Sequence, residues 1–138
     1  MRDRFLHQLR SSLASAAVPY GYTLTIFASG AITGDLLGSP HAPQVLIFVA
    51  GAVAAFTSLE AVVHRSGLVV RHAPDAHSTA IWGHAHLLAA GLAIGAVWLA
   101  DGLLAGSALA WPVAGFLSTG LYLVLATVQA IAAQGRGR

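Results

Sequence analysis

Charged residues are scarce in this chain, and cysteine is missing. Charged residues make up 9% of its 138 positions and lysine does not occur, whereas an average soluble domain carries roughly 25% charged residues. So few charges cannot cover a water-soluble surface, which argues against a soluble enzyme and an ordinary nucleic-acid binder. The absence of cysteine excludes disulfides, thiolate metal sites, iron–sulfur clusters and a cysteine nucleophile.

Common catalytic and nucleotide-binding motifs are missing as well. The sequence contains no phosphate-binding loop, no nucleophile elbow and no dinucleotide-binding fingerprint. It is rich instead in hydrophobic residues, which make up 57% of the chain and give a mean hydropathy of +0.73. We therefore predict a protein of the lipid bilayer that is not an enzyme and has no nucleic-acid partner.

Four apolar stretches are long enough to cross a membrane. An α-helix rises 1.5 Å per residue, so about 20 apolar residues span a hydrocarbon core of about 30 Å. Residues rich in glycine, proline and aspartate separate the stretches, which cover roughly 14–34, 44–64, 79–100 and 110–132. This pattern predicts an all-α fold, an integral membrane four-helix bundle that forms a single domain over residues 1–138.

The basic residues indicate the orientation of the bundle. All seven are arginines, and they lie in the two tails and the middle loop: Arg2, Arg4, Arg10, Arg65, Arg71, Arg136 and Arg138. The connections after the first and third spans carry Asp35 and Asp101 instead. Because positive loops stay in the cytoplasm, we predict cytoplasmic N- and C-termini in an inner (plasma) membrane of bacterial type.

Two halves of the chain resemble each other weakly. Residues 29–32 before Asp35 are similar to residues 94–97 before Asp101. One interpretation is a parallel repeat of two helices. The alternative is chance similarity between helices that are all rich in glycine and alanine.

Small residues four positions apart predict close helix packing. Gly30 and Gly34 form one such motif, Gly91 and Gly95 form another, and Gly51 and Ala55 form a weaker version. Motifs of this kind let two helix backbones approach each other in lipid. Four short spans leave little room for a path inside one copy, so we predict a homo-oligomer with an ion path between its subunits.

Polar residues are predicted at one depth near the cytoplasmic side. A first interpretation makes Glu60, His64, His84 and Tyr22 a transport site, because a carboxyl and an imidazole can load and release protons near neutral pH. Glu60 is central to it, since no other acidic residue lies well inside a span. Asp35 and Asp101 would then attract cations to an outer mouth.

Two other interpretations of this layer stay open. Histidines are common metal ligands, so His64, His77, His84 and His86 are candidates for binding haem b or a divalent metal. The third interpretation is structural: the polar groups are hydrated near the headgroups or join helices by hydrogen bonds. The hydroxyl series of the first span (Tyr22, Thr25, Ser29 and Thr33) is compatible with a wet path or with helix packing.

The sequence thus favours a small oligomeric channel or transporter for a proton or small cation, without a cofactor. The alternatives are a haem- or metal-binding membrane subunit and a non-catalytic structural subunit of a larger membrane complex.

Overall fold

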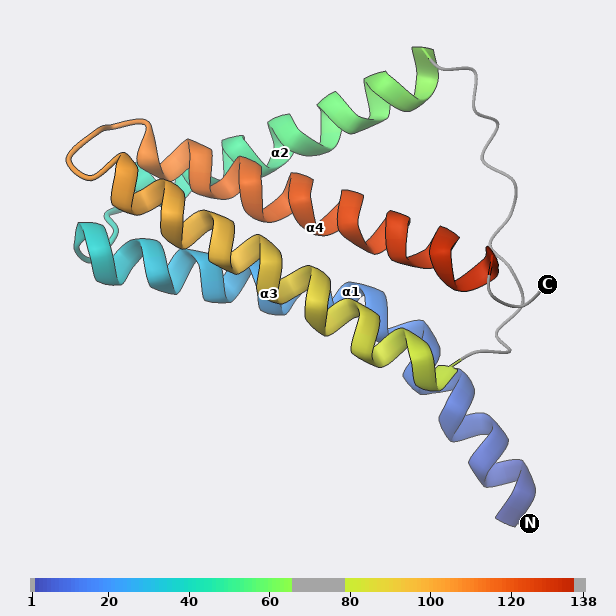
Figure 1. Cartoon of the computed structure of the whole chain (residues 1–138). Coiled ribbons are helices and arrows are strands. Elements are labelled where there is room, and N and C mark those ends of the chain that lie inside the picture. Colours follow the sequence, from blue (N-terminus) through green and yellow to red (C-terminus); the bar gives the residue numbers. More distant parts are fainter. Residues whose placement is uncertain (1, 66–78, 136–138) are drawn as a thin grey trace.

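Four helices, without any strand, form the part of the chain that the computed structural model describes, residues 2–65 and 79–135 (Figure 1). They are α1 (Arg2–Leu37), α2 (Ala42–Arg65), α3 (Thr79–Leu103) and α4 (Ala110–Gly135). Side chains are described for residues 19–65, 86–129, 131 and 132. The prediction of an all-α fold is confirmed, and α2, α3 and α4 match the predicted spans to within a few residues.

Three of the described helices are long and apolar enough to cross a membrane: Ala42–Arg65, His86–Leu103 and Ala110–Gln129. α2 alone has 24 residues, which corresponds to about 36 Å at 1.5 Å per residue. These helices mark the chain as a membrane protein. The span predicted at 14–34 lies within α1, and its place in the bilayer stays a prediction.

The turn between α1 and α2 has a clear chemical basis. Gly38 ends α1 with a φ of 95°, a left-handed conformation that glycine adopts without strain. The His41 carbonyl then accepts from the backbone N–H of Gln44 at 2.9 Å, and the Gln44 side chain accepts from the His41 N–H at 2.7 Å. This reciprocal cap fixes the start of α2.

The turn between α3 and α4 follows similar rules. Gly106 has a φ of 83°, and the Ser107 side chain accepts from the backbone N–H of Leu109 at 3.2 Å just before α4 begins. The short connection holds the end of α3 beside the start of α4.

α1, α3 and α4 pack against one another, and α2 packs mainly on α4 (Figure 1). In their N-terminal halves α2 and α4 approach closely, because Gly51 faces the backbone of Pro112 and Gly115 faces the backbone of Phe48. A side chain at either glycine would collide with that backbone. Toward its C-terminal end α2 diverges from the other helices (Figure 1).

The core of the bundle contains two apolar clusters at different heights. Phe48, Val97, Trp111 and Ala114 form the first, where α2, α3 and α4 meet near the α3–α4 turn. The second cluster is built on Ala89, Ala90, Ala93 and Tyr122. Its alanines let α3 lie close to its neighbours, so polar side chains between the same helices are buried.

Candidate functional site

Buried polar side chains lie among α1, α3 and α4, and we call them the polar interior. They are Thr25, Ser29, Thr33, His86, Asp101, Ser118 and Thr119. On α1 the three hydroxyl residues are four apart, so they share one helix face. Polar side chains within membrane-spanning helices are expensive and usually face the bundle interior or a hydrated cavity. This set is therefore the strongest candidate for a functional site.

Asp101 is the buried acidic residue at the end of α3. Its side chain is 0% exposed, and its Oδ2 lies 2.7 Å from Thr33 Oγ1 on α1. Thr33 and Asp101 both stand near the C-terminal ends of their helices, so α1 and α3 run in the same direction. The pair joins these two helices at the end of the bundle that holds the α3–α4 turn.

Two oxygen atoms beside this pair have no hydrogen-bond partner among the described residues. They are Asp101 Oδ1 and Ser29 Oγ, and both are buried. Ser29 precedes Thr33 by one helical turn, and Thr33 Oγ1 also lies 2.9 Å from the Ser29 carbonyl oxygen. Buried polar atoms of this kind are rare and call for an explanation such as a bound ion or water.

Asp101 has no cationic partner among the side chains that the structure describes. Within the described part of the chain its contact is with a neutral hydroxyl, Thr33, and Asp35 on the neighbouring helix is exposed. The arginines of the described side chains are limited to Arg65, at the far end of α2. A carboxyl group without a counter-ion in a buried place is able to bind a proton or a small cation.

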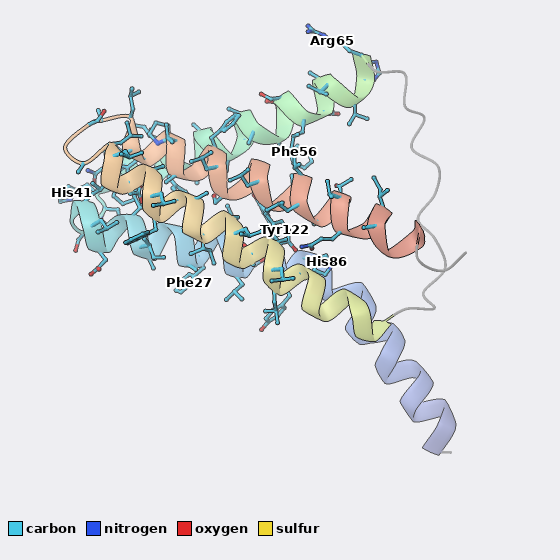
Figure 2. The ribbon with its side chains drawn as sticks, viewed as in Figure 1. Phe27, His41, Phe56, Arg65, His86 and Tyr122 are labelled. Carbon is cyan, nitrogen blue, oxygen red and sulfur yellow. The ribbon has the colours of Figure 1, made fainter. Side chains whose placement is uncertain are left out.

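A second polar group occupies the other end of the polar interior. The Tyr122 hydroxyl on α4 lies 3.3 Å from His86 Nδ1 on α3, with ring centroids 6.2 Å apart (Figure 2). The Tyr22 hydroxyl on α1 lies 3.2 Å from Thr119 Oγ1. Gly21 leaves the space for the Tyr122 hydroxyl, because a Cβ there would collide with it. The rings of Tyr22 and Tyr122, with centroids 6.0 Å apart, bring these two hydrogen bonds from three helices together.

The two ends are far apart along the bundle. Asp101 follows His86 by about 22 Å along α3, at a rise of about 1.5 Å per residue, which is most of a hydrocarbon core of about 30 Å. Hydroxyls of Thr25, Ser29 and Ser118 occupy the interval, and Ala93 and Val97 line the same interior from α3. Buried hydroxyl and apolar side chains thus lie between a carboxyl and an imidazole.

The structure separates the residues of the predicted transport site. Tyr22 lies half-buried at the polar interior, whereas Glu60 and His64 are exposed on the part of α2 that diverges from the other helices (Figure 1). No hydrogen bond or ion pair joins Glu60 to Tyr22 in the described chain. His84 lies in α3, but its side chain is outside the described set.

The two aspartates of the predicted outer mouth differ from each other. Asp35 is exposed in the last turn of α1, while Asp101 is enclosed within the bundle. Sequence reasoning placed both at a hydrated end of the spans. It had no signal for the burial of Asp101, because the length of a span gives height along the axis and not the direction of a side chain.

The histidines considered as metal or haem ligands are not gathered in the described residues. No group of three or more His, Asp or Glu side chains suited to a metal occurs there. His86 contacts Tyr122, His64 is exposed on α2, and His77 lies outside the described residues. The haem or metal interpretation therefore stays a prediction.

Three residues of α4 join the site without having been predicted. Ser118, Thr119 and Tyr122 are buried on one face of α4. Their spacing of three and four positions matches the hydroxyl series of α1, so a search for a second such series would have found them.

Comparison of the chain with protein-family models, curated proteins and solved structures finds no match.

Proposed function

We propose that this protein is a small membrane transporter or channel for a proton or small cation, with its path in the polar interior. One observation carries the proposal: Asp101 is a fully buried carboxyl group without a cationic partner in the described chain. Ionisable groups inside membrane-spanning segments are rare and typically mark ion or proton pathways.

The rest of the polar interior supports this function. Hydroxyl groups can pass protons along hydrogen bonds or replace part of the hydration shell of a cation. They lie between Asp101 and the His86–Tyr122 pair. In the proposed orientation, with both termini cytoplasmic, Asp101 stands toward the outside and His86 toward the inside.

The path we propose runs inside one copy, whereas the sequence favoured a path between copies. Tyr22 belongs to both versions, because it contacts Thr119 in the polar interior. Glu60 and His64 lie on the diverging part of α2. We assign them to the inner end of that helix, where a neighbouring copy can reach them.

A homo-oligomer remains part of the proposal. A Cβ on Gly30, Gly91 or Gly95 would meet nothing within 4 Å, so these motif glycines are available to another helix. An apolar groove of about 250 Å³ also opens between α2 and α4, with Ala55, Leu59 and Leu121 among its lining residues. A second copy of this chain matches both surfaces, since its own outer faces are equally apolar.

Ion flux in proteoliposomes tests the proposal directly. The wild-type protein is reconstituted and a gradient of protons, sodium or potassium is applied in separate assays. Asp101→Asn keeps the shape of the side chain and removes its charge, and we expect it to lower flux at least tenfold. Asp35→Asn is the matched control, because Asp35 is exposed on the neighbouring helix. Absence of flux for all three ions in the wild type would refute the function.

A further inference from the structure

Thr33 has one hydroxyl proton and two oxygen neighbours that could accept it. Its Oγ1 lies 2.9 Å from the Ser29 carbonyl oxygen and 2.7 Å from Asp101 Oδ2. A carbonyl oxygen can only accept a hydrogen bond, and an ionised carboxylate is likewise only an acceptor. If Asp101 were ionised, one of these two short contacts would have no proton between its oxygens.

We propose that the ion held at Asp101 is a proton, bound to Oδ2; this rests on the proposed function and names its ion. The carboxylic acid then donates from Oδ2 to Thr33 Oγ1, and Thr33 donates to the Ser29 carbonyl. Each of the two contacts obtains one proton. The uncharged acid also removes the cost of a buried charge that lacks a cation.

The same side chains also allow the proton to leave Asp101. When Oδ2 loses its proton to a water molecule, the Thr33 hydroxyl can rotate and donate to the carboxylate. The Ser29 carbonyl keeps the backbone hydrogen bond from the Thr33 N–H that an α-helix provides. Ser29 Oγ and Asp101 Oδ1, both without a partner in the described chain, are the neighbouring atoms that a transferring water molecule can contact.

None of the described titratable side chains on the helices packed against Asp101 offers a positive charge to an ionised Asp101. Among the described side chains of α1, from residue 19 onward, they are Tyr20, Tyr22 and Asp35; Asp35 is exposed, and Tyr22 pairs with Thr119. On α4 Tyr122 is paired with His86 at the opposite end of the polar interior. None of these groups contacts Asp101, so none supplies the positive charge that an ionised Asp101 would need.

Infrared spectroscopy of the membrane-reconstituted protein tests the proposal. We expect the C=O stretching band of a buried carboxylic acid at neutral pH, with a shift on transfer to D₂O. Carbon-13 labelling of aspartate shows, without any mutation, whether this band comes from an aspartate. Asp101→Asn should remove it, whereas Asp35→Asn and Glu60→Gln should leave it. Thr33→Val should move the band to higher frequency because the acid loses its acceptor, and Thr33→Ser should restore it.

The outcomes separate the proton site from transport. An acid band from aspartate in a protein without ion flux supports the proton site and refutes the proposed function. Flux without such a band overturns the proton site and leaves the function. A carboxylate band that responds to sodium at constant pH also overturns it, in favour of a bound metal cation. Wild-type labelling alone decides whether a protonated aspartate is present, so misfolding of a variant cannot obscure its absence, and the Asp101→Asn and Asp35→Asn variants then assign the band to a residue.

Discussion

Thr33 Oγ1 and Asp101 Oδ2 lie 2.7 Å apart although 68 positions separate the two residues in the sequence. This contact ties α1 to α3 at one end of the bundle, where both side chains are completely buried. Interhelical hydrogen bonds in membrane proteins contribute about 0.6 kcal/mol on average and up to about 1.7 kcal/mol. The contact is therefore modest in its effect on stability, and its main interest is that it marks the proposed ion site.

Thr33→Val should lower the free energy of unfolding by about 1 kcal/mol, within the range measured for such interhelical hydrogen bonds. The change removes the hydroxyl and nearly conserves the volume. Unfolding in a mixed detergent, followed by circular dichroism, measures the difference. Thr23→Val is the matched control, because Thr23 is exposed and its hydroxyl bonds within α1, to the Pro19 carbonyl. Equal losses in the two variants would contradict a special role for the Thr33–Asp101 contact.

Gly21→Ala should destabilise the protein, because its Cβ would collide with the Tyr122 hydroxyl. Overpacking of this kind typically costs about 1–3 kcal/mol. Tyr122→Phe removes the colliding oxygen, so the double variant should be more stable than the sum of the two single changes predicts. A double-mutant cycle of unfolding free energies measures this coupling. Strict additivity would contradict the contact between Gly21 and Tyr122.

The sequence predicted the helices well because their lengths follow from the bilayer and their ends from turn residues. Gly38 and Gly106 both adopt the left-handed conformation just after α1 and α3. The sequence was less informative about which face of its helix each side chain occupies. Height along a span follows from chain position, but the direction of a side chain depends on how the helix is rotated by packing, as Asp101 and Glu60 demonstrate.

The glycines illustrate the same limit. The four-residue spacing singled out Gly30, Gly91 and Gly95, whose open sides meet no atom of the described chain within 4 Å. The close backbone approach occurs at Gly51, which forms only the weaker motif with Ala55, and at Gly115, which this spacing did not single out. Local spacing does not reveal which of several small residues meets a neighbouring backbone, because that depends on the crossing point of two helices far apart in sequence.

Gly51→Ala should therefore lower the stability of the fold, whereas Gly91→Leu should weaken self-association. A Cβ at Gly51 would collide with the backbone of Pro112, which cannot move aside as a flexible side chain would, so we expect a loss of about 1–3 kcal/mol in unfolding free energy. Gly91→Leu should leave unfolding unchanged and weaken self-association. Unfolding measures the first effect, and energy transfer between labelled copies in vesicles measures the second. Unaltered energy transfer in Gly91→Leu would argue against an oligomer built on this motif.

Single introduced cysteines test the proposed orientation without labelling of other thiols, because the sequence contains no cysteine. Cysteines at Ser39 and Ser107, in the two turns, should react with an impermeant thiol reagent added outside intact cells. A cysteine at Ser66, outside the described residues, should react only after permeabilisation. The arginine distribution gives the physical reason. Labelling of the Ser66 variant in intact cells would reverse the orientation.

Glu60→Gln distinguishes the path inside one copy from the path that the sequence favoured. Glu60 is exposed on the part of α2 that diverges from α4 (Figure 1), whereas Asp101 is buried between α1 and α3. If ions cross through the polar interior, Glu60→Gln should leave proton flux within about twofold of the wild type, because a side chain outside the path should change the barrier by less than about 0.4 kcal/mol, which is about twofold in rate. Asp101→Asn, assayed at equal protein level, should lower flux at least tenfold. A larger loss of flux in Glu60→Gln than in Asp101→Asn would instead place the ion path at the α2 surfaces of neighbouring copies, with Glu60 as its central group.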